Sequence, residues 1–353
     1  MMEFKGAWTA LVTPFKKDGS VDWKGFEKNV DFQMKEGISG LLPMGTTGES
    51  PTVSHEEHNA INKKIFDYAA GRCEILAGCG SNSTEESIKS VKSAAESGIK
   101  AALIIDCYYN GPSSFELRTR HYSRIAEMFP DIEFVPYIIP GRTGCEMSAY
   151  DLALLGEKYS NINAVKEATG NIERMEIEGS ILPEGFAILS GDDGITFEMM
   201  ISPKIKACGV ISVLTNIVPA AISRMCRAAL AGRYGEAKEI NKKLKPLFDV
   251  ITVTSLRIEE IKGKQYKVTD KFRNPVPIKT LMNALGIPSG IVRAPLGSMT
   301  PAGVSTLRSA LKSVWLLSPE ILKPVQEFYG TDIGKVLTDD SMWEALAAVE
   351  EKK

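Results

Sequence analysis

Eight short hydrophobic runs divide the first two thirds of the chain at intervals of about 30 residues, the length of one strand–helix unit. They cover residues 8–13, 38–44, 74–79, 101–105, 133–138, 163–166, 186–190 and 208–212. Each run is almost continuously apolar, which is typical of parallel strands covered on both faces. We therefore expect eight parallel β-strands.

Amphipathic stretches with helical spacing separate these runs. They cover residues 21–36, 54–70, 84–97, 113–129, 148–158 and, after the last run, 219–231. Ser54 followed by Glu57, and Thr84 followed by Ser87, are candidate helix caps. The alternation predicts an α/β fold, a (β/α)₈ TIM barrel over residues 1–231. A doubly wound sheet would usually carry a glycine-rich loop after its first strand, which this chain lacks.

Residues 232–353 predict a C-terminal helical extension of the barrel. Helical patterns cover residues 234–247 and 277–285. Residues 252–272 are rich in charge and partly alternating, which predicts an inserted small hairpin or an exposed excursion. The tail over residues 318–353 predicts one or two short helices and a frayed, charged end.

The composition narrows the class of protein. The chain has 353 residues, 44% of them hydrophobic, and a formal net charge of −2, which argues against binding to nucleic acid or to a membrane surface. No apolar stretch is long enough to span a membrane, and the first residues do not form a signal peptide. The six cysteines include no CxxC pair, as expected for reduced thiols in a cytoplasmic protein.

Polar and glycine-rich segments follow the predicted strands, where the active site of a TIM barrel lies. They are Thr13-Pro14, Gly45-Thr46-Thr47-Gly48-Glu49, Gly78-Cys79-Gly80-Ser81-Asn82, Tyr108-Tyr109-Asn110, Pro140-Gly141-Arg142-Thr143-Gly144, Lys166-Glu167, Ser190-Gly191-Asp192-Asp193 and Ser212. Hydroxyl groups and flexible backbone gathered at one rim predict a small-molecule site.

Lys166 closes an apolar run and so places an amine on a strand that should be buried. Burial disfavours the ammonium and lowers the lysine pKa, which frees a neutral amine to attack a carbonyl carbon. Position alone equally allows a structural lysine that pairs with Glu167 or another carboxylate. Lys166 is thus a candidate for Schiff-base chemistry.

Three other features of the rim have a chemical and a structural interpretation. Tyr137 could carry protons beside an imine, or be a core aromatic with a satisfied hydroxyl. The turn Gly45-Thr46-Thr47-Gly48 could bind a carboxylate through backbone N–H groups, or be a plain tight turn. Arg142 could bind a second carboxylate, or form a surface ion pair.

His55 and His58 lie three positions apart, on one face of a predicted helix, as two metal ligands would. No carboxylate at the spacing of a metalloprotease and no third ligand accompany them. We therefore expect neither a metal nor a cofactor.

Several strings fall in order at successive strand ends. They are Gly45-Thr46-Thr47-Gly48-Glu49-Ser50, Tyr108-Tyr109-Asn110, Tyr137 with Pro140-Gly141-Arg142-Thr143-Gly144, Lys166-Glu167-Ala168-Thr169-Gly170, Ser190-Gly191-Asp192-Asp193, Gly209-Val210-Ile211-Ser212 and, in the helical part, Asn274-Pro275-Val276-Pro277-Ile278-Lys279. Together they resemble the dihydrodipicolinate synthase / N-acetylneuraminate lyase family.

The resemblance implies that Lys166 forms a Schiff base with pyruvate, whose enamine then attacks an aldehyde. A proton relay would consist of Tyr137, Thr46 and Tyr109, the last reaching in from a neighbouring subunit of a homo-oligomer, in the family habit a tetramer. The backbone at Thr46 and Thr47 would bind the pyruvate carboxylate, and Arg142 would bind the carboxylate of the aldehyde. The carbonyl of Gly191 and the side chain of Ile211 would line the pocket.

The string Arg142-Thr143-Gly144 is similar to the synthase members, which condense pyruvate with aspartate 4-semialdehyde to 4-hydroxy-tetrahydrodipicolinate in lysine and diaminopimelate biosynthesis. Lyase members usually lack the arginine and carry Ser-Thr in place of Thr46-Thr47. The lysine feedback site of regulated synthases matches at Ser50, His55, His58, Asn82, Glu86 and Tyr108, although Pro51 replaces a small residue. Alternatively, these six are inherited cap and interface residues.

Three differences from the usual sequence of the family leave other enzyme activities of that family possible. Ile138 follows Tyr137 where the family usually has Asn, Asp106-Cys107 replaces Thr-Pro, and residues 252–272 and the tail exceed the common length. A 2-keto-3-deoxy-sugar-acid aldolase or an N-acetylneuraminate-lyase-type enzyme is the first alternative. The second is a non-catalytic ligand-binding relative, which would have lost the lysine, a tyrosine or a threonine; none is lost.

Overall fold

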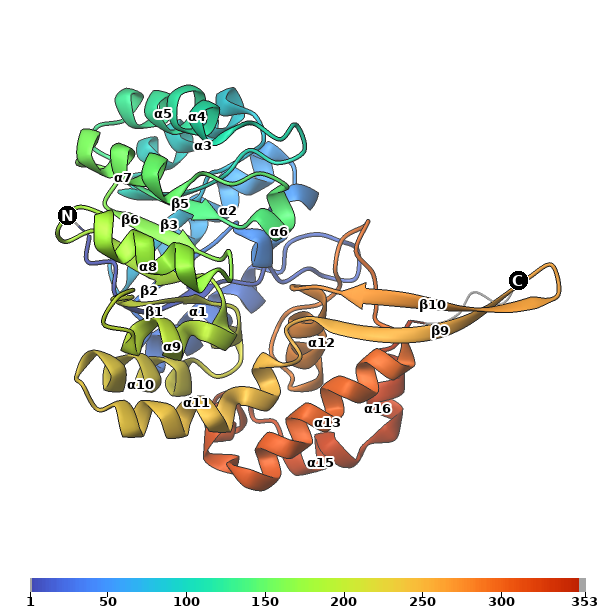
Figure 1. Ribbon diagram of the computed structural model, residues 1–353. Coiled ribbons are helices and arrows are strands. Elements are labelled where there is room, and N and C mark those ends of the chain that lie inside the picture. Colours follow the sequence, from blue (N-terminus) through green and yellow to red (C-terminus); the bar gives the residue numbers. More distant parts are fainter. Residues whose placement is uncertain (1, 349–353) are drawn as a thin grey trace.

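The computed structural model describes residues 2–348, and a closed barrel of eight parallel strands forms its centre (Figure 1). The strands are β1 (Gly6–Ala10), β2 (Gly40–Leu42), β3 (Glu74–Gly78), β4 (Ala101–Ile105), β5 (Glu133–Ile138), β6 (Ala164–Glu167), β7 (Ala187–Ser190) and β8 (Gly209–Ser212). Each strand pairs with the next, and β8 pairs with β1. The predicted (β/α)₈ barrel is confirmed.

Side chains fill the barrel because alternate residues of each strand point inward. The inner cluster includes Trp8, Leu42, Val135, Tyr137 and Ile211, whereas the residues between them pack outward against the helices. Gly40 is required opposite Trp8, since a Cβ there would lie 2.3 Å from the indole Cζ3. The barrel is therefore a packed core, and we expect a ligand to bind beyond the carboxyl ends of its strands.

Helices cover the outside of the barrel (Figure 1). They are α1 (Trp23–Lys35), α2 (His55–Ala69), α3 (Thr84–Glu96), α4 (Ser114–Glu116), α5 (Ser123–Met128), α6 (Pro140–Thr143), α7 (Ala149–Lys158), α8 (Ile172–Ile181), α9 (Thr196–Ile201) and α10 (Pro219–Leu230); a π-helical segment, η3 (Leu117–Tyr122), lies between α4 and α5, and short 3₁₀ turns are η1 (Thr46–Gly48), η2 (Ser50–Thr52), η4 (Asp193–Ile195) and η5 (Leu214–Asn216). Within residues 2–348 no helix has the length and apolar character needed to cross a membrane.

The two candidate caps have different outcomes. Ser54 forms a reciprocal capping box with Glu57 at the start of α2, as predicted. The predicted cap at Thr84 is wrong. Ser83 caps α3 by accepting from the Glu86 N–H, while the Thr84 hydroxyl lies 3.0 Å from Nδ1 of His121.

A C-terminal region of helices follows the barrel. Its helices are α11 (Tyr234–Phe248), α12 (Val276–Ala284), α13 (Pro301–Leu317), α14 (Lys323–Tyr329), α15 (Ile333–Thr338) and α16 (Asp340–Ala345), with a 3₁₀ turn η6 (Pro319–Ile321). The described part of the tail, residues 318–348, thus holds three short α-helices instead of the one or two expected, and α13 was not singled out from the sequence. The predicted frayed end, residues 349–353, lies outside the described residues.

An antiparallel hairpin occupies the insertion predicted near residues 252–272. Its strands are β9 (Val253–Ile261) and β10 (Lys264–Phe272), paired from Val253 with Phe272 to Ile261 with Lys264. The hairpin extends away from the barrel, while both of its ends return to the region beside α6 and α12 (Figure 1). Its base is therefore placed next to the ends of the barrel strands.

Candidate active site

Lys166 lies at the inner face of β6, near the carboxyl end of the strand. Its side chain is only 5% exposed, and Nζ lies 4.2 Å from the ring centre of Tyr137, its partner in the register of β5 and β6. Glu167 points to the opposite face, where it accepts from Nε of Arg174 at 3.1 Å. Lys166 forms no ion pair with any residue in 2–348, so the structural alternative of a Lys166–Glu167 pair does not hold.

Burial lowers the pKa of Lys166 to about 7, although the carboxylate of Asp193 acts in the opposite direction. A substantial fraction of the side chain is thus neutral near pH 7 and carries a free electron pair. Asp193 is itself buried, receives a hydrogen bond from the Val213 N–H at 2.9 Å and another from Ser212, and burial raises its pKa to about 6. The sequence string contained Asp193, but its role as counter-charge was missed.

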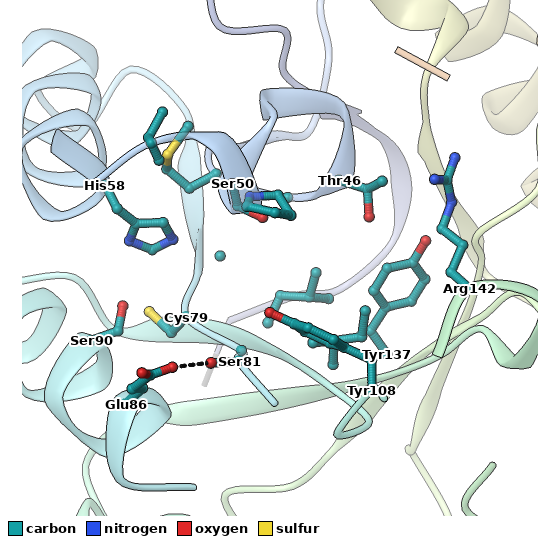
Figure 2. A pocket seen from close by; sticks show the side chains of 18 of the residues that line it. Thr46, Ser50, His58, Cys79, Ser81, Glu86, Ser90, Tyr108, Tyr137 and Arg142 are labelled. Atoms are coloured by element: carbon teal, nitrogen blue, oxygen red, sulfur yellow. Dashed lines mark hydrogen bonds between the residues drawn. The ribbon is translucent and has the colours of Figure 1, made fainter. Parts of the chain in front are cut away.

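Tyr137 places a phenol beside this amine. Burial raises the pKa of Tyr137 to about 12, while the Arg142 charge and a hydrogen bond with Thr46 act against that shift. The hydroxyl therefore stays protonated at neutral pH. Figure 2 shows it directed toward the space between Thr46 and Arg142. Amine, phenol and threonine hydroxyl thus meet at one point, as a proton relay requires.

The turn after β2 is held by contacts from distant parts of the chain. Thr47 accepts through Oγ1 from Nδ2 of Asn274 at 3.0 Å, and Thr13 donates through Oγ1 to the Gly48 carbonyl at 2.7 Å. The first N–H groups of such a helical turn have no acceptor within it and are suited to a carboxylate. Asn274 belongs to one of the predicted strings, but only the fold brings it to Thr47.

A cavity of about 440 Å³ opens above Lys166. It is lined by Thr46, Thr47, Tyr137, Arg142, Lys166, Gly191, Asp192, Asp193 and, from the C-terminal region, Phe248, Asp249, Lys271, Arg273 and Asn274, among others. Gly191 keeps it open, since a Cβ there would lie 2.7 Å from Cβ of Ala168 and 3.2 Å from Cγ of Lys166. Ile211 is fully buried in the inner cluster with Tyr137 and is not among the residues that line this cavity.

A second cavity of about 410 Å³ adjoins the first and shares Thr46, Tyr137 and Arg142 with it. Its lining contains five of the six residues of the predicted lysine site, namely Ser50, His55, His58, Glu86 and Tyr108. Asn82 is exposed outside this lining. Ser81 lies in the wall instead and donates to Oε2 of Glu86 at 2.5 Å (Figure 2).

The histidine pair contributes to this second cavity. Burial lowers the pKa of His58 to about 4, so its imidazole is neutral at pH 7. His55 is exposed, with Nε2 at 3.8 Å from Oε1 of Glu86. In the part of the chain that the structure describes, no cluster of three or more His, Cys, Asp or Glu side chains is arranged to hold a metal ion.

Tyr109 lines neither of these two cavities of its own chain. It is 92% exposed and has a left-handed backbone with φ of 78°, a strained conformation for an aromatic residue. The buried Asp106 supports this segment by accepting from the Tyr122 hydroxyl at 2.7 Å and the Met147 N–H at 3.1 Å. Ile138, the other departure in the strings, packs outside the barrel and does not face the cavities.

A sequence profile of the dihydrodipicolinate synthetase family matches residues 3–314, nearly the whole chain. The chain belongs to this family. The resemblance read from the strings is thereby confirmed. The match ends within α13, so α14, α15 and α16 lie beyond it.

Individual members of the family agree with this assignment. The chain is 38% identical over 314 residues to a 4-hydroxy-tetrahydrodipicolinate synthase of Methanococcus maripaludis, covering 89% of this chain and 99% of the relative. A dihydrodipicolinate synthase of Acinetobacter baumannii, solved in complex with pyruvate, superposes with a TM-score of 0.79 at 35% identity, over 89% of this chain and 99% of the other. A dihydrodipicolinate synthase from Cyanidioschyzon merolae, solved with lysine bound, superposes with a TM-score of 0.80 at 33% identity, over 90% of this chain and 100% of the other.

Proposed function

We propose that this chain is a 4-hydroxy-tetrahydrodipicolinate synthase, which condenses pyruvate with aspartate 4-semialdehyde in lysine and diaminopimelate biosynthesis. The observation that carries the proposal is Lys166, an unpaired buried amine with a pKa of about 7 beside the protonated phenol of Tyr137. Such a pair has no use in a barrel that only binds ligands, which speaks against a non-catalytic relative.

In this proposal the neutral amine of Lys166 adds to the keto carbon of pyruvate, and loss of water gives the imine. The backbone N–H groups of Thr46 and Thr47 hold the pyruvate carboxylate. Removal of a proton from the methyl carbon yields an enamine, whose carbon attacks the aldehyde. Tyr137 with Thr46, joined by Tyr109 of another subunit, moves the protons, and Arg142 holds the carboxylate of the aldehyde.

The aldehyde is tested by comparing turnover of aspartate 4-semialdehyde with turnover of sugar-derived aldehydes at saturating pyruvate. We expect much faster turnover with the semialdehyde than with an aldehyde that lacks a carboxylate, because Arg142 lines the cavity and its guanidinium matches a carboxylate. Absence of turnover with the semialdehyde, together with turnover of a sugar aldehyde, would replace this proposal by the aldolase alternative.

Imine formation is expected to depend on pH with a midpoint near 7. The reactive form is the neutral amine, whose population grows as the pH rises through the pKa of Lys166, about 7. Below that pH the trapping rate with pyruvate and borohydride should rise about tenfold per pH unit, and above it the rate should level off. Asp193→Asn should move the midpoint lower, since the carboxylate of Asp193 raises the pKa of Lys166. A midpoint near 10 would contradict the assignment.

We propose further that lysine inhibits the enzyme by binding in the second cavity. Glu86 offers a carboxylate to an ammonium group, and the neutral His58 does not repel a cation. Glu86→Ala and His58→Ala should each raise the lysine concentration for half-inhibition by about tenfold or more. Glu85→Ala is the matched control, because Glu85 is exposed on the same helix and pairs with Arg124. Equal inhibition of all three variants would refute this site.

The proposal includes a cytoplasmic homo-oligomer, with the tetramer as the expected form. Its support is Tyr109, which is almost fully exposed and lines neither cavity of its own chain, as a residue shared with a neighbouring subunit would be. The six cysteines are all free thiols, which suits the cytoplasm.

A further inference from the structure

The inserted hairpin brings positive charge to the mouth of the cavity above Lys166. Lys271 is the second-last residue of β10, and Arg273 follows the strand directly. Both line the cavity, which Arg142 of α6 also lines. Neither residue was singled out from the sequence, because the pattern of residues 252–272 predicts a small hairpin or an exposed excursion and gives no sign of its position relative to the rim.

Arg142 and Arg273 are linked through the backbone. The guanidinium group of each donates a hydrogen bond to the carbonyl of a residue adjacent in sequence to the other arginine. Arg142 donates through Nη2 to the Asn274 carbonyl at 2.9 Å, and Arg273 donates through Nη1 to the Gly141 carbonyl at 3.0 Å. The backbone of Arg273 is anchored as well, since Asn274 bonds to Thr47 and the Arg273 carbonyl accepts from the Val276 N–H at 3.1 Å. The two guanidinium groups are therefore held close together before any ligand arrives.

No carboxylate compensates these charges. Among residues 2–348, Arg142, Lys271 and Arg273 take part in none of the ion pairs, and the nearest acids of the cavity have other partners. Asp249 pairs with Lys245, and Asp193 bonds to Ser212. Partial removal from water lowers the pKa of Arg142, and the charge of Arg273 lowers it further. Adjacent unpaired guanidinium groups around a cavity are a site for an anion.

We propose that Arg273 forms, with Arg142, a two-guanidinium subsite that holds the carboxylate of the aldehyde substrate, and that Lys271 adds to its positive field. The inference deepens the proposed function, on which it rests. It assigns to the hairpin a role in substrate specificity, because its second strand carries the chain to Arg273. Two guanidinium groups on one carboxylate favour an acidic aldehyde over a neutral sugar aldehyde of similar size.

The experiment compares Arg273→Gln with the unaltered enzyme at saturating pyruvate. Glutamine can still donate to the Gly141 carbonyl but carries no charge. We expect the KM for aspartate 4-semialdehyde to rise about tenfold, the loss of one partly exposed charged hydrogen bond. The KM for pyruvate and the yield of the borohydride-trapped adduct should stay unchanged. Arg273→Lys should recover part of the loss, and Lys271→Gln should have a smaller effect.

Two controls separate charge from structure. Lys267→Gln removes a charge from the exposed part of the same strand, outside the cavity lining, and should change nothing. An aldehyde without a carboxylate, such as propanal, should react equally with the unaltered enzyme and Arg273→Gln. An unchanged KM for the semialdehyde in Arg273→Gln, or an equal loss with propanal, would overturn the inference while the proposed function stands. Absence of any trapped pyruvate adduct in the unaltered enzyme would overturn both.

Discussion

Lys166→Ala is expected to abolish the covalent capture of pyruvate and to reduce turnover on the order of 10⁴-fold or more. The reason is that Lys166 is the amine at the inner end of β6, and neither Tyr137 nor Arg142 can replace it as a nucleophile. The measurement is the mass of the protein after incubation with pyruvate and borohydride. The unaltered chain should gain one reduced pyruvate, and Lys166→Ala none.

Loss of folding would not account for that result. Lys166→Met keeps the volume of the side chain and replaces a buried amine that forms no ion pair within the described residues, so its stability should be close to that of the unaltered chain. It should nevertheless form no adduct. Lys158→Ala is the matched control, since Lys158 is exposed on α7 and pairs with Glu127. An adduct of normal yield in Lys166→Ala would place the imine on another lysine and reject this site.

The second large effect is expected at Lys279, which joins the C-terminal region to the barrel. The side chain is 1% exposed on α12, and its Nζ donates to Oε1 of Glu49 at 2.7 Å and to the Thr13 carbonyl at 3.0 Å. Lys279→Met would leave the carboxylate of Glu49, itself 1% exposed, buried without its cation. We expect a loss of about 3–5 kcal/mol in the free energy of unfolding.

Thermal unfolding at a fixed protein concentration measures this loss as a lower Tm. The double variant Glu49→Leu/Lys279→Met should recover most of it, because no charge then stays unpaired in the interior. Lys245→Ala, which breaks an exposed pair with Asp249, should change the stability by less than about 1 kcal/mol. A Tm of Lys279→Met equal to that of the unaltered chain would show that the pair is not needed.

The barrel could be predicted from sequence because its signal is local. Each strand is a short apolar run, and the structure places β4 and β5 at the bounds that the pattern predicts. Errors occurred where a side chain had a distant partner. Thr84 looked like a helix cap, but its hydroxyl is used by His121, a residue that sequence reasoning could not place beside it.

The chemistry at the centre of the site was also local in origin. Lys166 could be singled out because a lysine within an apolar strand is unusual. The family resemblance of the ordered strings then favoured a catalytic lysine over one that forms a structural ion pair. The partners of that lysine were less accessible. The role of Asp193 depends on β7 and β8 lying side by side, which brings Ser212 and Val213 to its carboxylate.

What the sequence by itself determined is the order of the elements, the family and the choice of Lys166 as the candidate reactive lysine, since hydrophobic period and short strings are properties of neighbouring residues. The tertiary structure alone decided the surroundings of that lysine. Thr47 meets Asn274, Glu49 meets Lys279, and Arg142 meets Arg273 only after the chain has closed into a barrel and the C-terminal region has returned to its rim. Burial then sets the charge of each group, and burial is a property of the fold rather than of the string.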